Sequence, residues 1–376
     1  MEIFYIANAR IPTEKAHGFT IAKMCSELAQ TGSRVTLFVP KRRNTNPEEL
    51  FTFYELPKSF LVVEVPVLDL FSIERYLGKG AYILEAGSFF FSLFFKLLFK
   101  KRTAKIYTRE YWTILYAFLG YRISYECHWI PKYKNVFYPL NRLAHHIFVI
   151  SVGIEQEYRR RGFKNVTLSP SAVDIELFSK DVEKGVARKK LDLPQDAFLL
   201  VYTGNFKTMG EEKGLRTAIE MLTDSKENVA LVAVGGVEEY IHEYTELAKR
   251  SGIESRVILR GRVRQTELAL YQQAADALFM VFPDTQHYRL YMSPIKMFEY
   301  MASGRPIIAS DLPSITSVLT SQSAYIVAPG DQVGLKEAIE EIQSNPNEAK
   351  KRAEVARKQV GLYSWSEKAK KILTNI

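Results

Sequence analysis

The chain contains few cysteines and lacks the short signatures of common cofactor sites. Cys25 and Cys127 are the only cysteines among its 376 residues. Two cysteines are too few for a disulfide framework and form no zinc-binding spacing, so a reducing compartment is expected. No G-x-G-x-x-G dinucleotide fingerprint occurs. Residues 1–6 read as a strand rather than as a secretory signal, which favours a cytoplasmic location.

No apolar run is both long enough and uncharged enough to predict a membrane-spanning helix. The longest candidate, residues 82–99, is dense in Phe and Leu but contains Glu85 and Lys96, and a span needs about 20 apolar residues. A basic cluster, residues 100–102, follows it directly. The pattern favours a buried crossover helix between strands. A helix that dips into a membrane surface, with its basic end on lipid phosphates, is the alternative.

Acidic residues are scarce in the first half of the chain. Residues 1–178 contain 24 Lys and Arg against 16 Asp and Glu, a net charge of +8, whereas residues 179–376 contain 27 against 26. A basic half indicates an anionic partner, such as a weak peripheral contact with the inner face of a membrane, although a solvated surface without a partner has the same composition. Nucleic acid is not expected, because the aromatic residues lie in apolar runs rather than between basic residues.

Short apolar runs alternate with amphipathic stretches along the whole chain. This alternation predicts an α/β protein with two Rossmann-like, doubly wound domains in tandem. The hinge between the domains is expected near residues 179–196, where the charge density is high. The predicted strands of the first domain are 2–7, 35–39, 62–65, 104–108, 122–126, 147–151 and 166–168, and those of the second are 198–204, 229–234, 257–259, 277–282, 307–309 and 324–327.

Residues 293–304 predict a helix with both ends marked in the sequence. Ser293 is a good N-cap, Pro294 fits the first helical position, and Gly304 ends the helix. At about 100° per residue, Ile295 shares a face with Glu299, so a carboxylate lies on the side that should be buried. Glu299 could pair with a basic residue inside a core. Alternatively, the carboxylate and the free N–H groups of the helix N-terminus could bind the ribose and phosphates of a nucleotide diphosphate.

The first domain offers two further candidates. His128 stands just past the end of the strand at 122–126, and ligands of open α/β sheets bind beyond the carboxyl ends of strands. A histidine satisfied inside the core is the alternative. His17 and Gly18 stand in the loop expected before a helix at 19–30, where a glycine would let a ligand approach the helix N-terminus. Ordinary turn chemistry would also explain Gly18.

Taken together, these segments resemble the retaining glycosyltransferases of family 4, which have the GT-B fold with two domains facing a central cleft. The resemblance covers nearly the whole chain and is most specific at residues 293–311. It implies an acceptor-side domain at 1–180, a donor domain at 181–357 and a last helix at 358–376 that returns to the first domain. The other matching segments are Gly204-Asn205-Phe206 with Lys213-Gly214, Gly261-Arg262-Val263, Pro170 with Val173-Asp174 and Phe178, and Trp365.

The resemblance also implies roles for individual residues. Glu299 would hold the ribose hydroxyls of a nucleotide-sugar donor, Lys213 would neutralise its diphosphate, and the backbone of residues 293–295 would cap a phosphate. Gly18 would approach the same phosphates, and His128 would be the catalytic residue that faces the donor sugar. No metal or other cofactor is implied, because positive charge and helix ends stabilise the leaving nucleoside diphosphate.

Two positions depart from the pattern of this family. Tyr291 stands where the first of two glutamates is usual, and a phenol is uncharged at neutral pH. Asn205 stands where Arg is common, so Lys207 could supply the missing charge, while Arg262 belongs to the turn on the side of the base. The donor sugar, linked to UDP or GDP, is therefore not named by the sequence.

The acceptor side is less specified. It would be formed by loops at 8–18, 41–60 and 109–135, with His17, Arg109 and Trp112 as candidate contacts. The expected activity is transfer of a sugar to a glycan, lipid-linked or small-molecule acceptor, as in cell-envelope glycan synthesis. Two alternatives remain: a nucleotide-sugar epimerase of the same architecture, for which Glu126 is one of few acid–base candidates, and an inactive sugar-binding or scaffold protein.

Overall fold

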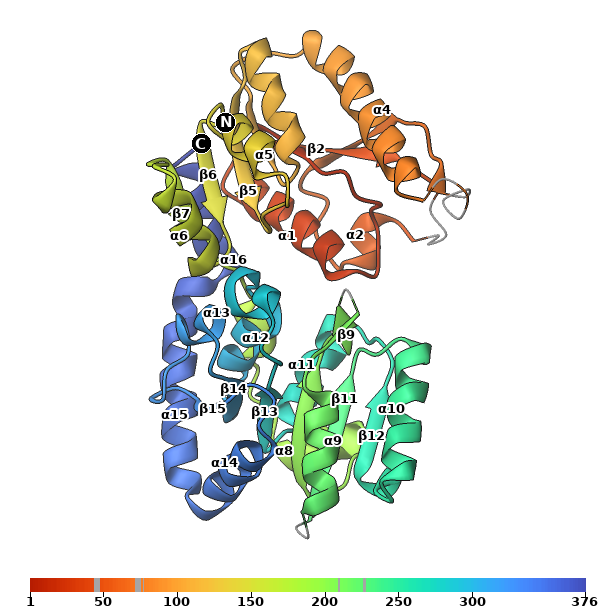
Figure 1. Ribbon diagram of the computed structural model, residues 1–376, viewed down its shortest axis with the longest axis vertical. Coiled ribbons are helices and arrows are strands. Elements are labelled where there is room, and N and C mark those ends of the chain that lie inside the picture. Colours follow the sequence, from red (N-terminus) through yellow and green to blue (C-terminus); the bar gives the residue numbers. More distant parts are fainter. Residues whose placement is uncertain (44–47, 72–75, 77, 209, 226–227) are drawn as a thin grey trace. The chain divides into compact units, whose positions relative to one another are not determined.

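The computed structural model describes residues 1–43, 48–71, 76, 78–208, 210–225 and 228–376. Its contacts divide the chain into two compact units (Figure 1). Unit 1 comprises Met1–Ile150, Ile154–Ser169 and Trp365–Ile376, and unit 2 comprises Ser151–Gly153 and Pro170–Ser364. The divisions fall after residues 169 and 364, whereas the sequence suggested residues 180 and 357.

Unit 1 is built on a parallel sheet of seven strands in the order β3-β2-β1-β4-β5-β6-β7. The order reverses between β1 and β4, which places a topological switch point there. The strands are β1 (Glu2–Ile6), β2 (Arg34–Lys41), β3 (Leu61–Pro66), β4 (Lys105–Thr108), β5 (Arg122–Cys127), β6 (His146–Val149) and β7 (Val166–Leu168).

The right-handed crossover rule puts the helices on both faces of this sheet. Helix α1 connects β1 to β2 on one face, and α4 crosses from β3 to β4 on the other, where it packs beside η2. The C-terminal helix α16 packs against α1. The bounds are α1 (Ala16–Gln30), α2 (Leu50–Phe53), α4 (Lys79–Leu98), η2 (Tyr111–Leu119), α5 (Lys134–Asn141), α6 (Val152–Arg160) and α16 (Trp365–Leu373).

Unit 2 has a parallel sheet of six strands in the order β12-β11-β8-β13-β14-β15, with its switch point between β8 and β13. The strands are β8 (Phe198–Thr203), β11 (Val229–Val234), β12 (Val257–Arg260), β13 (Ala277–Met280), β14 (Ile307–Ser310) and β15 (Tyr325–Val327). A separate hairpin is formed by β9 (Lys207–Thr208) and β10 (Glu211–Glu212).

Alternate residues of these strands enter two different cores, as a sheet covered on both faces requires. Leu199 and Val201 of β8 belong to one core, while Leu200 and Tyr202 belong to the other. The helices are α7 (Ile175–Phe178), α8 (Lys184–Lys190), α9 (Leu215–Asp224), α10 (Glu238–Arg250), α11 (Gln265–Gln273), α12 (Ile295–Ser303), α13 (Pro313–Thr316), α14 (Gln332–Ser344) and α15 (Pro346–Gln359), with short turns at η3 (Glu254–Arg256), η4 (His287–Tyr291) and η5 (Val360–Tyr363).

The expected hinge at residues 179–196 is wrong, because this charged stretch folds into unit 2. Its helix α8 carries Arg188, which is only 3% exposed and forms an ion pair with Asp276. Lys184 binds the same carboxylate at 2.5 Å. The charges therefore fasten α8 to the start of β13 instead of keeping the segment in solvent.

Candidate functional site

The carboxyl ends of β8, β11 and β13 approach one another closely at the switch point of unit 2. Gly204 and Gly235 follow β8 and β11 with φ angles of 112° and 114°. A Cβ atom on Gly235 would lie 2.7 Å from the Gly204 carbonyl oxygen, and one on Gly214 would lie 2.1 Å from that of Val281. Only glycine fits these positions, and the close approach at Gly214 brings the neighbouring Lys213 to the end of β13.

Two lysines with lowered pKa values lie at this edge. Burial lowers the pKa of Lys213 to about 8. Lys296, in the first turn of α12, is 8% exposed, and burial and then Lys213 hold its pKa well below the usual value. Its Nζ atom lies 3.3 Å from the centroid of the Tyr202 ring and has no hydrogen-bond partner within the described part of the chain. Burial thus disfavours the charged form of both lysines, and a bound anion would favour it.

Glu299, the carboxylate of α12, lies one turn after Lys296 and is 6% exposed. Its Oε2 atom accepts a hydrogen bond of 3.3 Å from Gln272, whose amide also reaches Thr203 Oγ1 at the end of β8. Burial raises the pKa of Glu299 to about 7, while Lys296 and Gln272 oppose the shift. The sequence left open an ion pair between Glu299 and a basic residue of the core. Glu299 instead has the Gln272 amide as its hydrogen-bond partner.

A raised pKa at Glu299 predicts a pH-dependent cost in stability. The folded state holds the proton up to about pH 7, whereas an exposed glutamate loses it near 4.3, so this cost grows between these two pH values and is complete above them. Glu299→Gln should remove the cost and stabilise the donor-free protein above pH 7 by roughly 2 kcal/mol. Hydrogen exchange of β8 and β13 amides at pH 5 and pH 8 measures the difference.

The exposed Glu354, on α15, supplies the matched control. Glu354→Gln should leave the pH dependence of exchange in β8 and β13 at the wild-type slope. An equal slope in the Glu299→Gln variant and the wild type would contradict the assigned protonation of Glu299.

The start of α12 differs from the sequence expectation. The helix begins at Ile295 and Pro294 is its N-cap residue, without a side-chain cap. Ser293 does not cap the helix; its Oγ accepts a hydrogen bond of 2.9 Å from the backbone N–H of Ser171. The end is as predicted, since Gly304 adopts the left-handed conformation at φ 69°. The helix N-terminus consequently lacks a capping oxygen from its own N-cap residue.

Four further donor-side candidates have distinct surroundings. Asn205 and Arg262 come together, with Arg262 Nη2 donating to Asn205 Oδ1 at 3.4 Å. Lys207 forms an ion pair of 2.6 Å with Glu243, whose side chain is 40% exposed. Tyr291 is half-buried at the end of η4.

In unit 1 the structure brings Arg109, Glu126 and His128 into one network beyond β4 and β5. Glu126 is fully buried, and its Oε2 atom accepts from Arg109 Nε at 2.7 Å and lies 3.0 Å from His128 Nε2. Its Oε1 atom is 2.7 Å from Lys368 Nζ on α16. Arg109 also donates to Thr20 on α1 at 2.8 Å. Arg109, predicted as a candidate acceptor contact, is thus a partly buried partner of Glu126.

The charges around His128 define its protonation. Burial and then Arg109 lower its pKa, although Glu126 opposes them. Arg109, Lys368 and His128 together outweigh desolvation and keep the pKa of Glu126 well below its usual value. An ionised carboxylate only accepts hydrogen bonds, so His128 Nε2 carries the proton and Nδ1 is the free lone pair. His128 is therefore a neutral, oriented imidazole at neutral pH.

The remaining candidates of unit 1 are an exposed His17 and two residues with close packing contacts. His17 and Gly18 lie in the first turn of α1, which begins at Ala16 rather than at residue 19. A Cβ on Gly18 would lie 2.2 Å from the Tyr54 hydroxyl, so packing requires this glycine. Trp112 packs edge-on against Phe90 of α4 with ring centroids 5.7 Å apart. The loops proposed for the acceptor follow β1, β2, β4 and β5, and residues 44–47 of the 41–60 loop lie outside the described residues.

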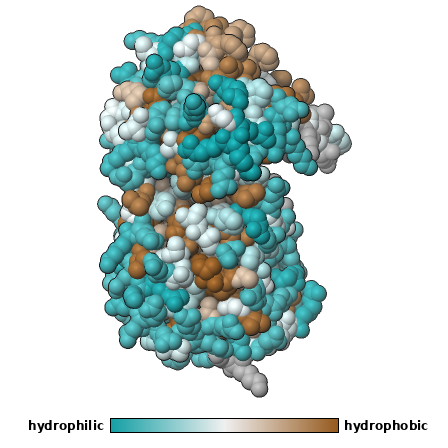
Figure 2. Space-filling model, turned by 60° about the vertical axis from the view of Figure 1, so that its left-hand side comes forward, coloured by the Kyte–Doolittle hydropathy of each residue, from teal (hydrophilic) through white to brown (hydrophobic). Residues whose placement is uncertain are grey.

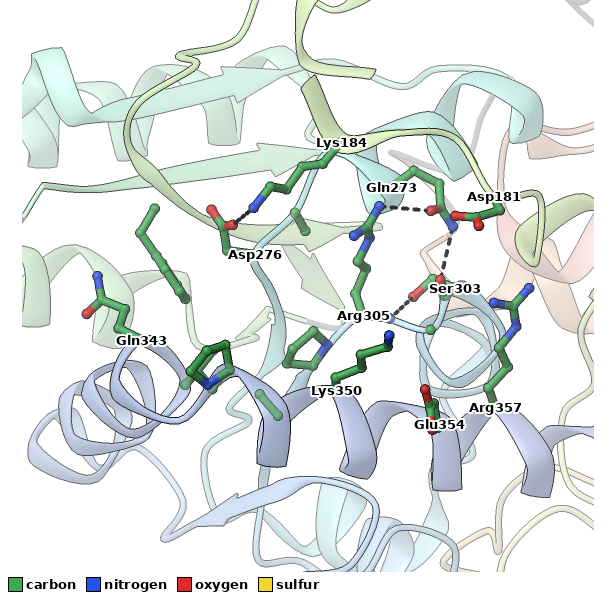
Figure 3. Close-up of a pocket in the computed structure, with 17 residues that line it drawn as sticks. Asp181, Lys184, Gln273, Asp276, Ser303, Arg305, Gln343, Lys350, Glu354 and Arg357 are labelled. Atoms are coloured by element: carbon green, nitrogen blue, oxygen red, sulfur yellow. Dashed lines mark hydrogen bonds and ion pairs between the residues drawn. The ribbon is translucent and has the colours of Figure 1, made fainter. Parts of the chain in front are cut away.

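A pocket in unit 2 lies at the opposite edge of the sheet (Figure 3). Its lining includes Phe198, Asp276 and Pro306, which stand at the beginnings of β8, β13 and β14. Arg305 donates to Gln273 there, and Asp276 holds Lys184. Parallel α/β sheets bind ligands at the carboxyl ends of their strands. This pocket is accordingly not the candidate site.

No group of three or more His, Cys, Asp or Glu side chains is placed to hold a metal ion within the described ranges. Lys296 is the functional candidate that the sequence patterns did not identify. A lysine in the first turn of a helix opposes the helix dipole, and its spacing of three residues from Glu299 places both near one face. A lysine at this unfavourable position was the sequence feature that could have identified Lys296 as a candidate.

The architecture of the two units is the GT-B fold. It resembles sucrose-phosphate synthase from Thermosynechococcus elongatus with a TM-score of 0.76 and 18% identity, covering 99% of this chain and 97% of that one. It also resembles WaaG, a glycosyltransferase involved in lipopolysaccharide biosynthesis, with a TM-score of 0.70 and 16% identity over the whole of both chains. Anabaena HepE, solved with UDP and glucose, has a TM-score of 0.73 at 15% identity, covering 100% of each chain.

Within this fold, residues 197–345 match the family model described as glycosyl transferases group 1. A D-inositol 3-phosphate glycosyltransferase from Xylanimonas cellulosilytica is 24% identical over 54% of this chain and 49% of its own length. The lipopolysaccharide core biosynthesis glycosyltransferase LpsD of Rhizobium meliloti is 32% identical over 43% of each chain. The chain thus spans about half the length of the curated relatives it matches.

Proposed function

We propose that the protein is a glycosyltransferase that moves a sugar from a nucleoside-diphosphate sugar to an acceptor with retention of anomeric configuration. The observation that carries this proposal is a pair of lysines at the switch point of unit 2, whose charged forms are disfavoured by burial and would be stabilised by an anion. Lys213, Lys296 and the uncapped N-terminus of α12 gather at the edge where α/β sheets bind ligands. A diphosphate is the anion that would satisfy all three.

The other residues of unit 2 fit the remaining parts of a nucleotide. Glu299 is next to this charge, and its carboxylate would accept hydrogen bonds from the ribose hydroxyls. Asn205 and Arg262, which contact each other beyond β8 and β12, would lie on the side of the base. Tyr291 would contact the sugar through an uncharged hydroxyl. The lysines would stabilise the leaving diphosphate as the glycosidic bond breaks, so the proposed reaction uses no resident metal.

Unit 1 would supply the acceptor side. His128, held by Glu126 with its Nε2–H engaged, would present its second ring nitrogen to the hydroxyl groups of the reacting sugars.

The names of the relatives support the choice of substrates. HepE was solved with UDP and glucose, and relatives are named for transfer to inositol 3-phosphate or for lipopolysaccharide core synthesis. We therefore propose a UDP- or GDP-linked hexose as donor and a polyol phosphate, glycan or lipid-linked acceptor of the cell envelope.

A donor screen tests this proposal. The protein is incubated with UDP- and GDP-linked sugars and a panel of polyol phosphates, oligosaccharides and lipid-linked sugars, and products are identified by mass spectrometry and proton NMR. The expected result is an acceptor-dependent product with the anomeric configuration of the donor. An inverted product would contradict retention. Nucleoside diphosphate released without acceptor would favour an epimerase, and donor binding without any product would favour a sugar-binding protein.

A further inference from the structure

The outward face of α4 is an exposed apolar surface. Leu84, Phe91, Phe95 and Leu98 recur at the spacing of one helical face and are 51%, 63%, 60% and 39% exposed. By length and composition alone the segment Gly80–Leu98 could cross a membrane, contrary to the sequence expectation, and only 28% of its apolar window is buried. The favoured expectation of a buried crossover helix is therefore wrong for this face.

The opposite face of α4 belongs to the fold of unit 1. Phe89, Leu93 and Leu97 are fully buried there, and the buried Glu85 forms an ion pair of 2.7 Å with Arg42. Extraction of α4 to span a bilayer would expose these side chains and break a buried ion pair. The helix consequently stays on unit 1 and presents its other side.

The apolar surface continues onto η2. Tyr116 stacks on Phe90 of α4, with ring centroids 4.9 Å apart and an angle of 6° between the planes. This contact aligns the two elements, and Phe118 of η2 is 76% exposed. Figure 2 shows hydrophobic side chains gathered at the top of the view, where α4 lies in Figure 1. We name the exposed side chains of Leu84, Phe91, Phe95, Leu98, Phe99, Leu115 and Phe118 the α4 surface.

Basic residues border the C-terminal end of α4. Residues 86–109 contain six Lys and Arg and no Asp or Glu. Lys100 and Lys101 are exposed, whereas Arg102 donates to the carbonyl oxygens at the helix end and to Tyr121. Two exposed lysines therefore lie next to a row of exposed phenylalanines. This arrangement is complementary to a lipid bilayer, which has an apolar interior and negatively charged headgroups.

We propose that the α4 surface docks on an anionic membrane. The helix lies in the interface with its phenylalanines among the acyl chains, while Lys100 and Lys101 contact lipid phosphates. Apolar burial supplies most of the binding and the lysines add preference for anionic lipid. This attachment is independent of sugar transfer, and it would hold the protein where a lipid-linked acceptor is found.

Co-sedimentation of the full chain with vesicles tests this proposal. The vesicles contain phosphatidylcholine alone or with phosphatidylglycerol, at low and high salt. The wild type should bind the anionic vesicles, with weaker binding at high salt. Phe91→Ser with Phe95→Ser should reduce partitioning about 100-fold, at roughly tenfold per side chain. Lys100→Gln with Lys101→Gln should reduce it about 30-fold on anionic vesicles only, at about 1 kcal/mol per lysine.

A matched control removes two exposed apolar side chains from unit 2. Val333 and Leu362 are 66% and 74% exposed, and Val333→Ser with Leu362→Ser should bind vesicles as the wild type does. Tryptophan fluorescence confirms that unit 1 is folded in the α4 variants, and circular dichroism with thermal unfolding does so for the unit 2 control. Absence of wild-type binding at low salt overturns the proposal, and so does equal loss in the control. A wild-type dimer that Phe91→Ser with Phe95→Ser converts to a monomer would assign the surface to a second copy instead.

Discussion

Lys296→Met is expected to lower donor-dependent turnover about 100-fold or more while it stabilises the donor-free protein. The loss follows because Lys296 would lie against the leaving diphosphate in a water-poor site, where one ionic contact contributes several kcal/mol to the transition state. The gain follows because its buried Nζ atom has no hydrogen-bond partner in the described structure. Opposite signs for activity and stability distinguish a functional lysine from a structural one.

The stabilisation expected from Lys296→Met depends on pH. An unsatisfied buried polar group costs about 1–3 kcal/mol, so methionine should recover about that amount. Burial and then Lys213 hold the pKa of Lys296 well below 10.5 in the folded chain. The destabilisation, and with it the gain from methionine, is therefore largest at low pH and disappears as the pH rises toward 10.5.

Turnover and thermal unfolding of the same protein samples measure both effects. Lys350→Met, at the pocket on the opposite edge of the sheet, is the matched control and should keep wild-type turnover. If Lys296→Met kept full activity, or lost stability together with activity, Lys296 would be a packing residue and the site would need another anion-binding group.

Glu126→Gln is expected to destabilise unit 1 by about 3–5 kcal/mol, because it leaves buried cations without their carboxylate. Arg109 and Lys368 both lie 2.7 Å from Glu126, and the side chains of Lys368 and Glu126 are 6% and 0% exposed. The pKa of Glu126 is held well below its usual value. Its stabilisation is therefore present above the unfolded pKa and is lost only as the pH falls through the lower folded value.

Urea unfolding followed by tryptophan fluorescence suits this test, because Trp112, Trp129 and Trp365 all belong to unit 1. The control is Glu157→Gln, which removes a carboxylate that pairs with the more exposed Arg161 and should cost less than about 1 kcal/mol. Equal stability of Glu126→Gln and the wild type would show that the network does not support His128.

The parallel sheets could be predicted because their strands are short apolar runs between amphipathic helices. The strands Val166–Leu168 and Val229–Val234 have the predicted bounds. Charge patterns were less informative. The high charge density predicts a hinge near residues 179–196, but Arg188 pairs with Asp276, far along the sequence, and no local pattern reveals such a pair.

The candidate site was predicted only in part for the same reason. Glu299 and Lys213 could be named from their local sequence. In the structure both lie near Lys296, since Lys213 lowers the pKa of Lys296 and Lys296 lowers that of Glu299. Lys296 was not predicted because it is buried against Tyr202 of β8 and Gly204 just after it, which are distant in the sequence. The exposed face of α4 could not be predicted either, because a helix that is apolar on both faces has the same composition whether one face or both are buried.

Donor binding to unit 2 is the central claim, and calorimetric titration with UDP- and GDP-linked sugars tests it most directly. The wild type and Lys350→Met should bind one donor equally, while Lys213→Met and Lys296→Met should each bind it at least about tenfold more weakly, as loss of a charged hydrogen bond implies. Equal affinity in all four proteins, or a loss confined to Lys350→Met, would contradict a donor site at the carboxyl edge of β8 and β13.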